Sequence, residues 1–230
     1  MADPEAKVAL LAGATGLVGK YVLEELLQAP DFSRVYAITR RPLGRDHSRL
    51  ANRIVQFERL EEQLKGLTCH VAFCCLGTTL RAAGSEEAFR EVDVDYVLAF
   101  ARAARAAQAQ RFVVVSSVGA DSDSKFFYLQ AKGEMERQLA GVGFGALDIL
   151  QPGLLLGWRR EMRPLELAAS AVMPLLNLFL VGQLADKRGI SPRKVAAAMV
   201  GAARSGRRGM YRYTYPAIEA LARVRPVRAG

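Results

Sequence analysis

Tyr128 and Lys132 are the residues whose types and spacing most directly suggest chemistry. They stand four positions apart in a helical pattern, and a helix places such residues on one face, one turn apart. A tyrosine hydroxyl has a reference pKa of about 10, too high for ready proton exchange at neutral pH. A neighbouring lysine ammonium stabilises the phenolate and lowers that pKa. The pair therefore predicts a group that exchanges a proton with a carbonyl or alcohol oxygen.

Three glycines, Gly13, Gly16 and Gly19, follow the first apolar run with the spacing GxxGxxG and open a helical pattern. Glycine is needed where the main chain turns sharply and where a pyrophosphate must approach it closely. The start of the following helix offers N–H groups and a partial positive charge to phosphates. In this context the spacing predicts a dinucleotide-binding turn. The alternative is a turn that serves only helix–strand packing.

Arg40 and Arg41 follow the second apolar run, in the stretch AITRRPLG. Enzymes that bind NAD usually place an acid at this point to hold the ribose 2′-hydroxyl. Here no acid occurs before Asp46, whereas two guanidiniums suit a 2′-phosphate. The sequence therefore favours NADP(H) over NAD(H), the alternative being that both arginines are solvated loop residues.

Strand-length apolar runs alternate with longer helical patterns, and these elements must position the residues above. The predicted strands cover 7–13, 34–40, 53–57, 70–77, 111–117 and 146–152, and the predicted helices 17–29, 60–65, 86–107 and about 126–140. Runs that are apolar on successive residues are typical of strands covered on both faces. The alternation predicts an α/β fold: a doubly wound parallel sheet of the Rossmann type.

The pattern changes after residue 152. An apolar stretch (167–182), a helix that Ser191 can cap and Pro192 can open, an aromatic strand (209–215) and a final helix (217–224) follow. A chain of 230 residues suits one large domain. We therefore predict a single domain over 1–230, in which residues 153–230 form a small substrate-side cap.

The net charge of +9 lies mostly near the C-terminus, where residues 187–230 hold eleven Lys or Arg and one acid. A basic segment of this kind can meet nucleic acid or anionic lipid. No nucleic-acid motif accompanies the charge, so we expect a solvated surface and no nucleic-acid partner. The expected partner is a small-molecule substrate, and the sequence leaves monomer and dimer open.

The three cysteines, Cys69, Cys74 and Cys75, follow neither a disulfide framework nor a zinc pattern, and we predict no metal site. The longest apolar stretch is interrupted by Pro174 and Asn177 and is shorter than the ~20 residues of a spanning helix. The first ten residues lack the pattern of a signal peptide. We therefore expect a cytoplasmic protein without stable membrane insertion.

Several stretches together resemble the short-chain dehydrogenase/reductase superfamily, and within it the atypical branch that contains the HIV Tat-interacting oxidoreductase-like protein. They are GATGLVG, TRRP, FCCLGTT, VDVDYVL, SSVGAD, YLQAKGEME and QPGLLLGWRREMRPLE, which run from residue 13 to about residue 166. The resemblance implies a Rossmann fold and a catalytic group formed by Ser117, Tyr128 and Lys132. The cofactor site that it implies consists of Gly13, Ala14, Thr15, Gly16, Leu17, Val18, Gly19, Arg40, Arg41, Leu76, Gly77, Tyr128, Lys132, Leu155 and Arg163.

Three departures from the family pattern affect this interpretation. Asp93 stands where better-known reductases carry a catalytic asparagine, and Gln151 stands where relatives often carry arginine. Ser117 precedes Tyr128 by eleven residues, fewer than in many relatives, so Ser116 stays a candidate for the catalytic serine.

The function that the sequence predicts is an NADP-dependent oxidoreductase acting on an unidentified carbonyl or alcohol. The alternative is an NADPH-binding redox-sensing regulator with little turnover, and a sugar-nucleotide epimerase ranks third because the chain and its predicted cap are small.

Overall fold

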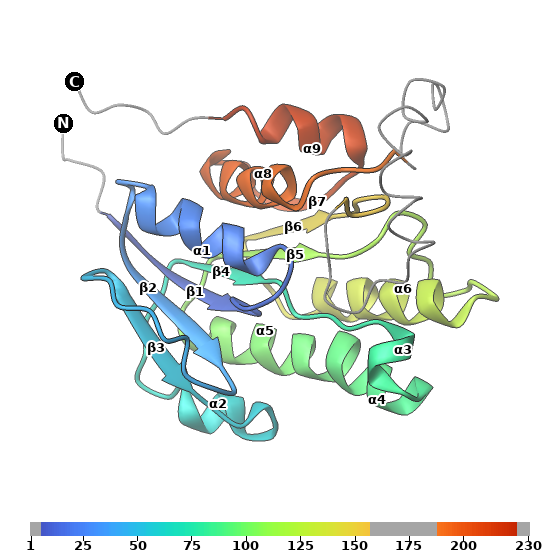
Figure 1. Cartoon of the computed structure of the whole chain (residues 1–230), viewed down its shortest axis with the longest axis horizontal. Helices are drawn as coiled ribbons and strands as arrows, with labels where there is room; N and C mark the ends of the chain where they lie inside the picture. Colours follow the sequence, from blue (N-terminus) through green and yellow to red (C-terminus); the bar gives the residue numbers. More distant parts are fainter. Residues whose placement is uncertain (1–5, 157–187, 225–230) are drawn as a thin grey trace.

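A parallel sheet forms the centre of the protein in the computed structural model, which describes residues 6–156 and 188–224 (Figure 1). In this part of the chain the sheet has seven strands in the order β3-β2-β1-β4-β5-β6-β7, and all neighbouring strands are parallel. The strands are β1 (Lys7–Ala12), β2 (Phe32–Thr39), β3 (Leu50–Ile54), β4 (Val71–Cys74), β5 (Arg111–Val115), β6 (Ala146–Leu150) and β7 (Gly209–Tyr213). The order reverses between β1 and β4, which makes the ends of these two strands the topological switch point.

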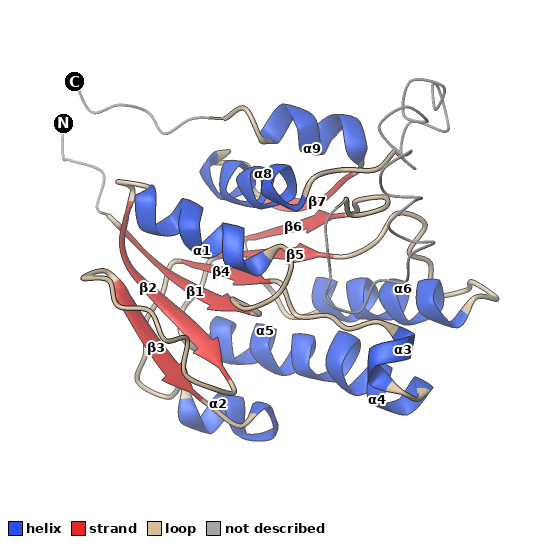
Figure 2. Cartoon of the chain, viewed as in Figure 1, coloured by secondary structure: helices blue, strands red, loops and turns tan. Residues whose placement is uncertain are grey.

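Helices cover both faces of the sheet (Figure 2). The helices are α1 (Gly19–Gln28), α2 (Leu60–Gln63), α3 (Leu80–Ala83), α4 (Glu86–Arg90), α5 (Tyr96–Ala106), α6 (Phe127–Ala140), α8 (Pro192–Arg204) and α9 (Tyr215–Leu221). In β1, Ala9 and Leu11 pack in the cluster that contains α1 and α8, whereas Leu10 and Ala12 pack in the cluster that contains α5 and α6. This burial on both faces explains why the strands are apolar on successive residues, and it confirms the predicted α/β doubly wound fold.

Most predicted boundaries differ from the structure by a few residues at one or both ends, and two predicted elements differ in a way that has a physical reason. The third strand was expected over 53–57 but is Leu50–Ile54, because β3 is an edge strand and its residues need not be apolar. The apolar signal came from Val55 and Phe57, which are buried just after the strand. The helix expected over 86–107 is divided into α4, a π-helical turn named η2 (Glu91–Asp95) and α5.

The described part of the C-terminal region belongs to the sheet and its helical layer. Strand β7 pairs with β6, and α8 lies against α1 (Figure 1). Helix α9 packs so closely on α8 that a Cβ on Gly201 would lie 2.2 Å from the Leu221 carbonyl oxygen. The described elements from 190 to 224 therefore extend the Rossmann sheet and its helical layer, and the substrate-side cap expected over 153–230 stays a prediction. Residues 157–187 and 225–230 of that range, with the apolar stretch at 167–182, lie outside the described residues.

A buried ion pair joins α8 to the sheet. The Arg111 guanidinium on β5 contacts the Asp148 carboxylate on β6 and also donates to the Ala202 carbonyl oxygen of α8 at 2.9 Å. The Tyr213 hydroxyl on β7 donates to the second Asp148 oxygen at 2.8 Å. Helix α8 begins with Pro192 as predicted, but the Ser191 side chain makes no capping hydrogen bond.

Candidate functional site

The glycine turn between β1 and α1 is tight and has no room for a side chain at Gly13 or Gly19. Gly13 has φ +80°, and a Cβ there would lie 2.4 Å from the Cys75 carbonyl oxygen. A Cβ on Gly19 would lie 2.0 Å from the Gly13 carbonyl oxygen. Glycine is therefore required at both positions, because one must adopt a left-handed conformation and the other must touch the main chain. The turn brings the first residues of α1 to the switch point of the sheet.

A cleft of about 420 Å³ lies at this switch point. Its lining comes from the glycine turn, from the segment after β4, from the end of β5 and from α6. The lining residues are Thr15, Gly16, Leu17, Val18, Lys20, Cys75, Leu76, Gly77, Thr78, Asp93, Val115, Ser116, Tyr128, Lys132 and Leu155. Ligands of open α/β sheets bind in such a crevice at the carboxyl ends of the strands. The N-terminus of α1, with its partial positive charge, faces the same space.

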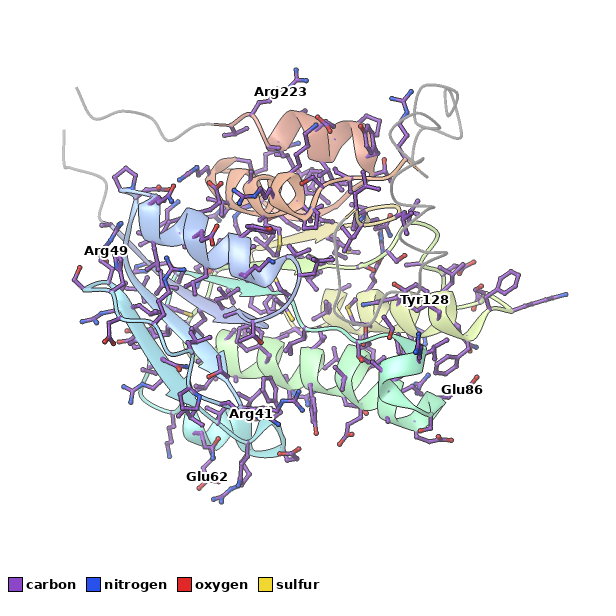
Figure 3. All side chains as sticks on the ribbon, in the orientation of Figure 1. Arg41, Arg49, Glu62, Glu86, Tyr128 and Arg223 are labelled. Carbon is purple, nitrogen blue, oxygen red and sulfur yellow. The ribbon has the colours of Figure 1, made fainter. Side chains whose placement is uncertain are left out.

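Tyr128 and Lys132 enter the cleft from α6, one helical turn apart, and Figure 3 labels Tyr128 on this helix. The Tyr128 ring is half-buried and packs against the Phe89 ring at 5.6 Å between centroids. Lys132 is buried, and its Nζ lies 2.6 Å from Oδ1 of Asp93, which is also buried. The other Asp93 oxygen accepts a hydrogen bond of 2.7 Å from the Thr78 N–H.

The environment of Lys132 keeps its ammonium charged. Burial by itself lowers the pKa of Lys132, but the negative charge of Asp93, the electrostatic interaction with Tyr128 and the hydrogen bond from Lys132 to Asp93 raise it more. The net result is a pKa above the ordinary lysine value. Asp93 reaches this position from the π-helical turn η2, a distortion that is frequent at functional sites. A positive charge is thereby fixed beside the Tyr128 hydroxyl.

The two candidate serines differ in their surroundings. Ser116 is buried, lines the cleft and donates from Oγ to Oε1 of Glu136 at 2.6 Å. Ser117 does not line the cleft, and its Oγ donates to the Val118 carbonyl oxygen at 3.4 Å. The structure thus brings Ser116, and not Ser117, to the space that Tyr128 faces.

Arg40 and Arg41 lie in the loop after β2, outside the cleft lining, and both side chains are exposed; Figure 3 labels Arg41. Asn52 holds this loop: its amide donates to Thr39 Oγ1 at 2.7 Å, and its Oδ1 accepts from the Leu43 N–H at 2.9 Å. Among the described residues, neither guanidinium has a hydrogen bond or ion pair. The loop is therefore fixed by side-chain hydrogen bonds while two cations stay available to an anionic ligand.

Known proteins share this sequence and architecture. Residues 13–159 match the protein family described as NAD(P)H-binding. Protein HTATIP2 of Rattus norvegicus is 43% identical over 164 residues, which cover 70% of this chain and 67% of the relative. The mitochondrial protein FMP52 of Saccharomyces cerevisiae is 40% identical over 157 residues, which cover 67% of this chain and 68% of the relative. The chain belongs to the NAD(P)H-binding family, as an atypical short-chain dehydrogenase/reductase of the HTATIP2 branch.

A solved structure agrees with the fold of this short-chain dehydrogenase/reductase. It is an oxidoreductase of the short chain dehydrogenase/reductase family from Burkholderia thailandensis, with a TM-score of 0.63 and 20% sequence identity. The match covers 90% of each chain, so the likeness extends over nearly the whole of both folds.

Most of the residues that the resemblance implied come together in the cleft of this short-chain dehydrogenase/reductase. Thr15, Gly16, Leu17, Val18, Leu76, Gly77, Tyr128, Lys132 and Leu155 line it. Gly13, Ala14 and Gly19 form the turn behind this lining. Ser117, Arg40 and Arg41 do not line it, and Arg163 lies outside the described residues.

Sequence reasoning missed Glu136, which accepts from Ser116 and also holds Gln151 and Arg212. Gln151 Nε2 donates to Glu136 Oε1 at 2.8 Å, and Arg212 Nε donates to Oε2 at 2.7 Å. Gln151 and Arg212 thus bind the two oxygens of the same buried carboxylate. The spacing of Glu136 from Tyr128 and Lys132, eight and four residues on one helix, was the signal available in the sequence.

The cysteines of this short-chain dehydrogenase/reductase are poorly suited to redox sensing. Cys75 lines the cleft, but burial raises the pKa of its thiol well above the ordinary value. Burial likewise raises the pKa of Cys74 to about 12. Thiols of this kind stay protonated and unreactive. In the described part of the chain no group of acidic, histidine and cysteine side chains could hold a metal ion, and no helix is long and apolar enough to cross a membrane.

Proposed function

We propose that this protein is an NADP-dependent oxidoreductase acting on a carbonyl or alcohol substrate. The observation that carries the proposal is the position of Tyr128 and of the Lys132–Asp93 ion pair in the same cleft as the glycine turn. The turn fits a pyrophosphate because Thr15, Gly16, Leu17 and Val18, which lead into the N-terminus of α1, line the cleft. When bound there, the nicotinamide supplies the hydride.

In this proposal Tyr128 exchanges a proton with the substrate oxygen from its hydroxyl. Lys132 is charged and lies next to Tyr128, so it stabilises the phenolate that forms when the proton leaves. Asp93 keeps the ammonium in place through a contact of 2.6 Å. Because Ser116 lines the cleft and Ser117 does not, we assign the substrate-holding role to Ser116.

The preference for NADP(H) over NAD(H) rests on Arg40 and Arg41. Both guanidiniums are exposed beside the end of β2, and the β2–β3 loop that carries them is held by Asn52. A 2′-phosphate at this point would form charge-assisted hydrogen bonds that a 2′-hydroxyl cannot form to the same extent. Calorimetric titration with both cofactors tests the preference, and equal affinity or tighter NADH binding would contradict it.

Turnover is tested by following NADPH absorbance, which falls when NADPH reduces an aldehyde or ketone of a panel and rises when NADP+ oxidises the corresponding alcohol. The proposal expects NADPH oxidation with at least one carbonyl, saturable in that substrate. A protein that binds NADPH stoichiometrically and oxidises it with no member of the panel would contradict the proposal.

A second function is a regulator that binds NADPH with little turnover, and two contacts favour it. The Lys132 ammonium is already paired with Asp93, and the Ser116 hydroxyl already donates to Glu136. Both groups would have to share or give up these partners to act on a substrate. The regulator hypothesis predicts that NADPH affinity is high while every carbonyl in the panel is inert.

We further propose a small-molecule partner, no nucleic-acid partner and a cytoplasmic location. The fungal relatives are named mitochondrial, which makes the mitochondrion the alternative location. Fractionation of cells that express the full chain distinguishes the two compartments. A gel shift with sub-micromolar affinity for nucleic acid at physiological ionic strength would contradict the expectation about partners.

A further inference from the structure

Two polar side chains, Thr39 and Asn52, hold the loop that carries Arg40 and Arg41. Thr39 is the last residue of β2 and is 7% exposed, and Asn52 is half-buried in the middle of β3. Asn52 pairs in register with Ala37, so its amide lies on the same face of the sheet as the side chains of Ala37 and Thr39, which stand two residues apart on β2. Both polar side chains therefore reach the point at which the chain leaves β2.

The hydrogen bonds of the Asn52 amide have only one possible direction. Its Oδ1 accepts from the Leu43 N–H at 2.9 Å, and its Nδ2 donates to the Ala37 carbonyl oxygen at 3.0 Å. A main-chain N–H can only donate and a carbonyl oxygen can only accept, so the amide cannot be turned the other way. Nδ2 also donates to Thr39 Oγ1 at 2.7 Å, and the Thr39 hydroxyl donates in turn to the Arg41 carbonyl oxygen at 2.8 Å. A chain of donors thus runs from Asn52 through Thr39 to Arg41.

These contacts fix the main chain on both sides of the two arginines. Before them stands Thr39, and after them Leu43 is anchored through its N–H and packs against the core cluster that contains α1. Pro42 lies between, and its ring fixes its own φ and restricts Arg41 to an extended conformation. The main chain of the loop therefore has few alternatives, while the two guanidiniums stay exposed.

The loop lies at the same edge of the sheet as the glycine turn. Ala12 at the end of β1 pairs with Ile38 of β2, so the glycine turn and the arginine loop leave their strands side by side. In dinucleotide-binding folds the residue after the second strand faces the adenosine ribose. A 2′-phosphate would therefore meet guanidiniums whose main chain is already fixed, and the loss of freedom on binding would be small.

We propose that Asn52 and Thr39 are positioning residues that determine cofactor specificity: by fixing the loop between them and Leu43, they hold Arg40 and Arg41 where the 2′-phosphate of NADP(H) binds. Neither side chain lines the cleft, so their effect is confined to the 2′-phosphate and does not extend to the part of the cofactor that NAD(H) shares. The inference rests on the proposed preference for NADP(H).

Two substitutions break the chain of donors at different points. Asn52→Leu removes every hydrogen bond of the amide at a similar side-chain size, and Thr39→Val removes the hydroxyl while keeping the branched shape. Each should weaken NADPH binding about fivefold, the effect of about one lost hydrogen bond, and leave NADH within about twofold of the parent. Calorimetric titration of each protein with both cofactors measures the ratio of the two affinities.

Two further variants separate the chain of donors from the rest of the side chains. The double variant Asn52→Leu, Thr39→Val should bind NADPH little more weakly than either single variant, because both substitutions interrupt the same chain. Thr39→Ser keeps the hydroxyl and should keep the affinity ratio of the parent. Thr39→Val and Thr39→Ser decide between the outcomes even where Asn52→Leu does not fold.

Arg49→Ala is the matched control, because it disturbs the same pair of strands at the other end. The Arg49 guanidinium donates to the carbonyl oxygens of Ala29 and Phe32 at 2.7 and 2.8 Å, away from the loop, and Figure 3 labels both Arg49 and Arg41. This variant should lower Tm and leave the ratio of NADPH to NADH affinity unchanged. A ratio that falls in Arg49→Ala as far as in Asn52→Leu would overturn the proposal.

The titrations also separate this proposal from the proposed function. A parent that prefers NADPH and keeps this preference in Asn52→Leu and Thr39→Val overturns the positioning role alone. An equal loss for NADPH and NADH in these variants overturns it too, because the two side chains would then act only by stabilising the fold. A parent that binds both cofactors equally contradicts the preference for NADP(H) and the positioning role together. Binding is measured without turnover, so a parent that reduces no carbonyl leaves the result decisive.

Discussion

Replacing Asp93 by asparagine removes the charge that compensates Lys132 while keeping the size of the side chain. The amide oxygen can still accept from the Thr78 N–H, a contact of 2.7 Å in the parent. Lys132 and Asp93 are 6% and 1% exposed at their side chains and 2.6 Å apart, so the ammonium is left buried without its partner. Breaking a buried pair in this way costs about 3–5 kcal/mol. For a protein of this size we expect Tm to fall by roughly 6–15 °C.

The pH dependence of this loss follows from the pKa of Lys132. In the parent the pKa lies above the ordinary value of 10.5, so the ion pair stabilises fully below 10.5 and its contribution is lost as pH rises through the higher folded value. In Asp93→Asn the charge of Asp93 is gone, so burial, the largest influence on Lys132, lowers its pKa. The deficit should then be largest at neutral pH and should shrink by up to about 1.4 kcal/mol per pH unit above the lowered pKa.

Urea unfolding of the parent and Asp93→Asn at pH 7 and pH 10 measures both effects. Glu62→Gln is the matched control, since it neutralises an acid in an exposed ion pair with Arg59. We expect a change below about 1 kcal/mol for this control. The reasoning is refuted if Asp93→Asn is as stable as the parent at pH 7, or if its deficit is the same at both pH values.

Three further predictions concern the turn, the sheet and the cofactor. Gly13→Ala puts a Cβ 2.4 Å from the Cys75 carbonyl oxygen at a residue with φ +80°. We therefore expect a lower Tm in thermal unfolding and weaker NADPH binding in calorimetry. An unchanged Tm together with unchanged NADPH affinity would contradict the turn geometry. Asp148→Asn leaves the buried Arg111 guanidinium without its carboxylate, and the free energy of unfolding in urea should fall by about 3 kcal/mol. A fall below about 1 kcal/mol would show that the ion pair is dispensable. Replacing Arg40 and Arg41 together by alanine should weaken NADPH binding at least about tenfold and leave NADH nearly unchanged, and an equal loss for both cofactors would contradict a 2′-phosphate site.

The layers of the fold were predictable because burial leaves a clear pattern in the sequence. Strands covered on both faces must be apolar on successive residues, and five runs of this kind gave β1, β2, β4, β5 and β6. Edge strand β3 was displaced because exposure removes the signal, while the buried Val55 after it imitates one. The π-helical turn η2 was not predictable, because hydrophobic periodicity does not distinguish it from the α-helices on either side.

The candidate site was predictable where chemistry depends on local spacing. The glycine turn and the pair Tyr128 and Lys132 are patterns within one or two turns of chain, and both line the cleft. The choice between Ser116 and Ser117 was not predictable from the sequence. Adjacent side chains after a strand point in different directions, so a difference of one residue in the strand's register decides which serine faces the cleft. The contact of Glu136 with Arg212, on strand β7, depends on the tertiary fold and has no local signature.

Tyr128→Phe tests the central claim most directly, because it removes only the hydroxyl from which the proton would be exchanged. Cofactor affinity should stay close to that of the parent, since the glycine turn and the arginines contribute most of the binding. The measurement is the rate of NADPH oxidation by the parent and by Tyr128→Phe, with a carbonyl that the parent reduces and with both proteins saturated with NADPH. We predict that the parent turns over and the variant does not. A Tyr128→Phe variant that oxidises NADPH as fast as the parent would contradict the account.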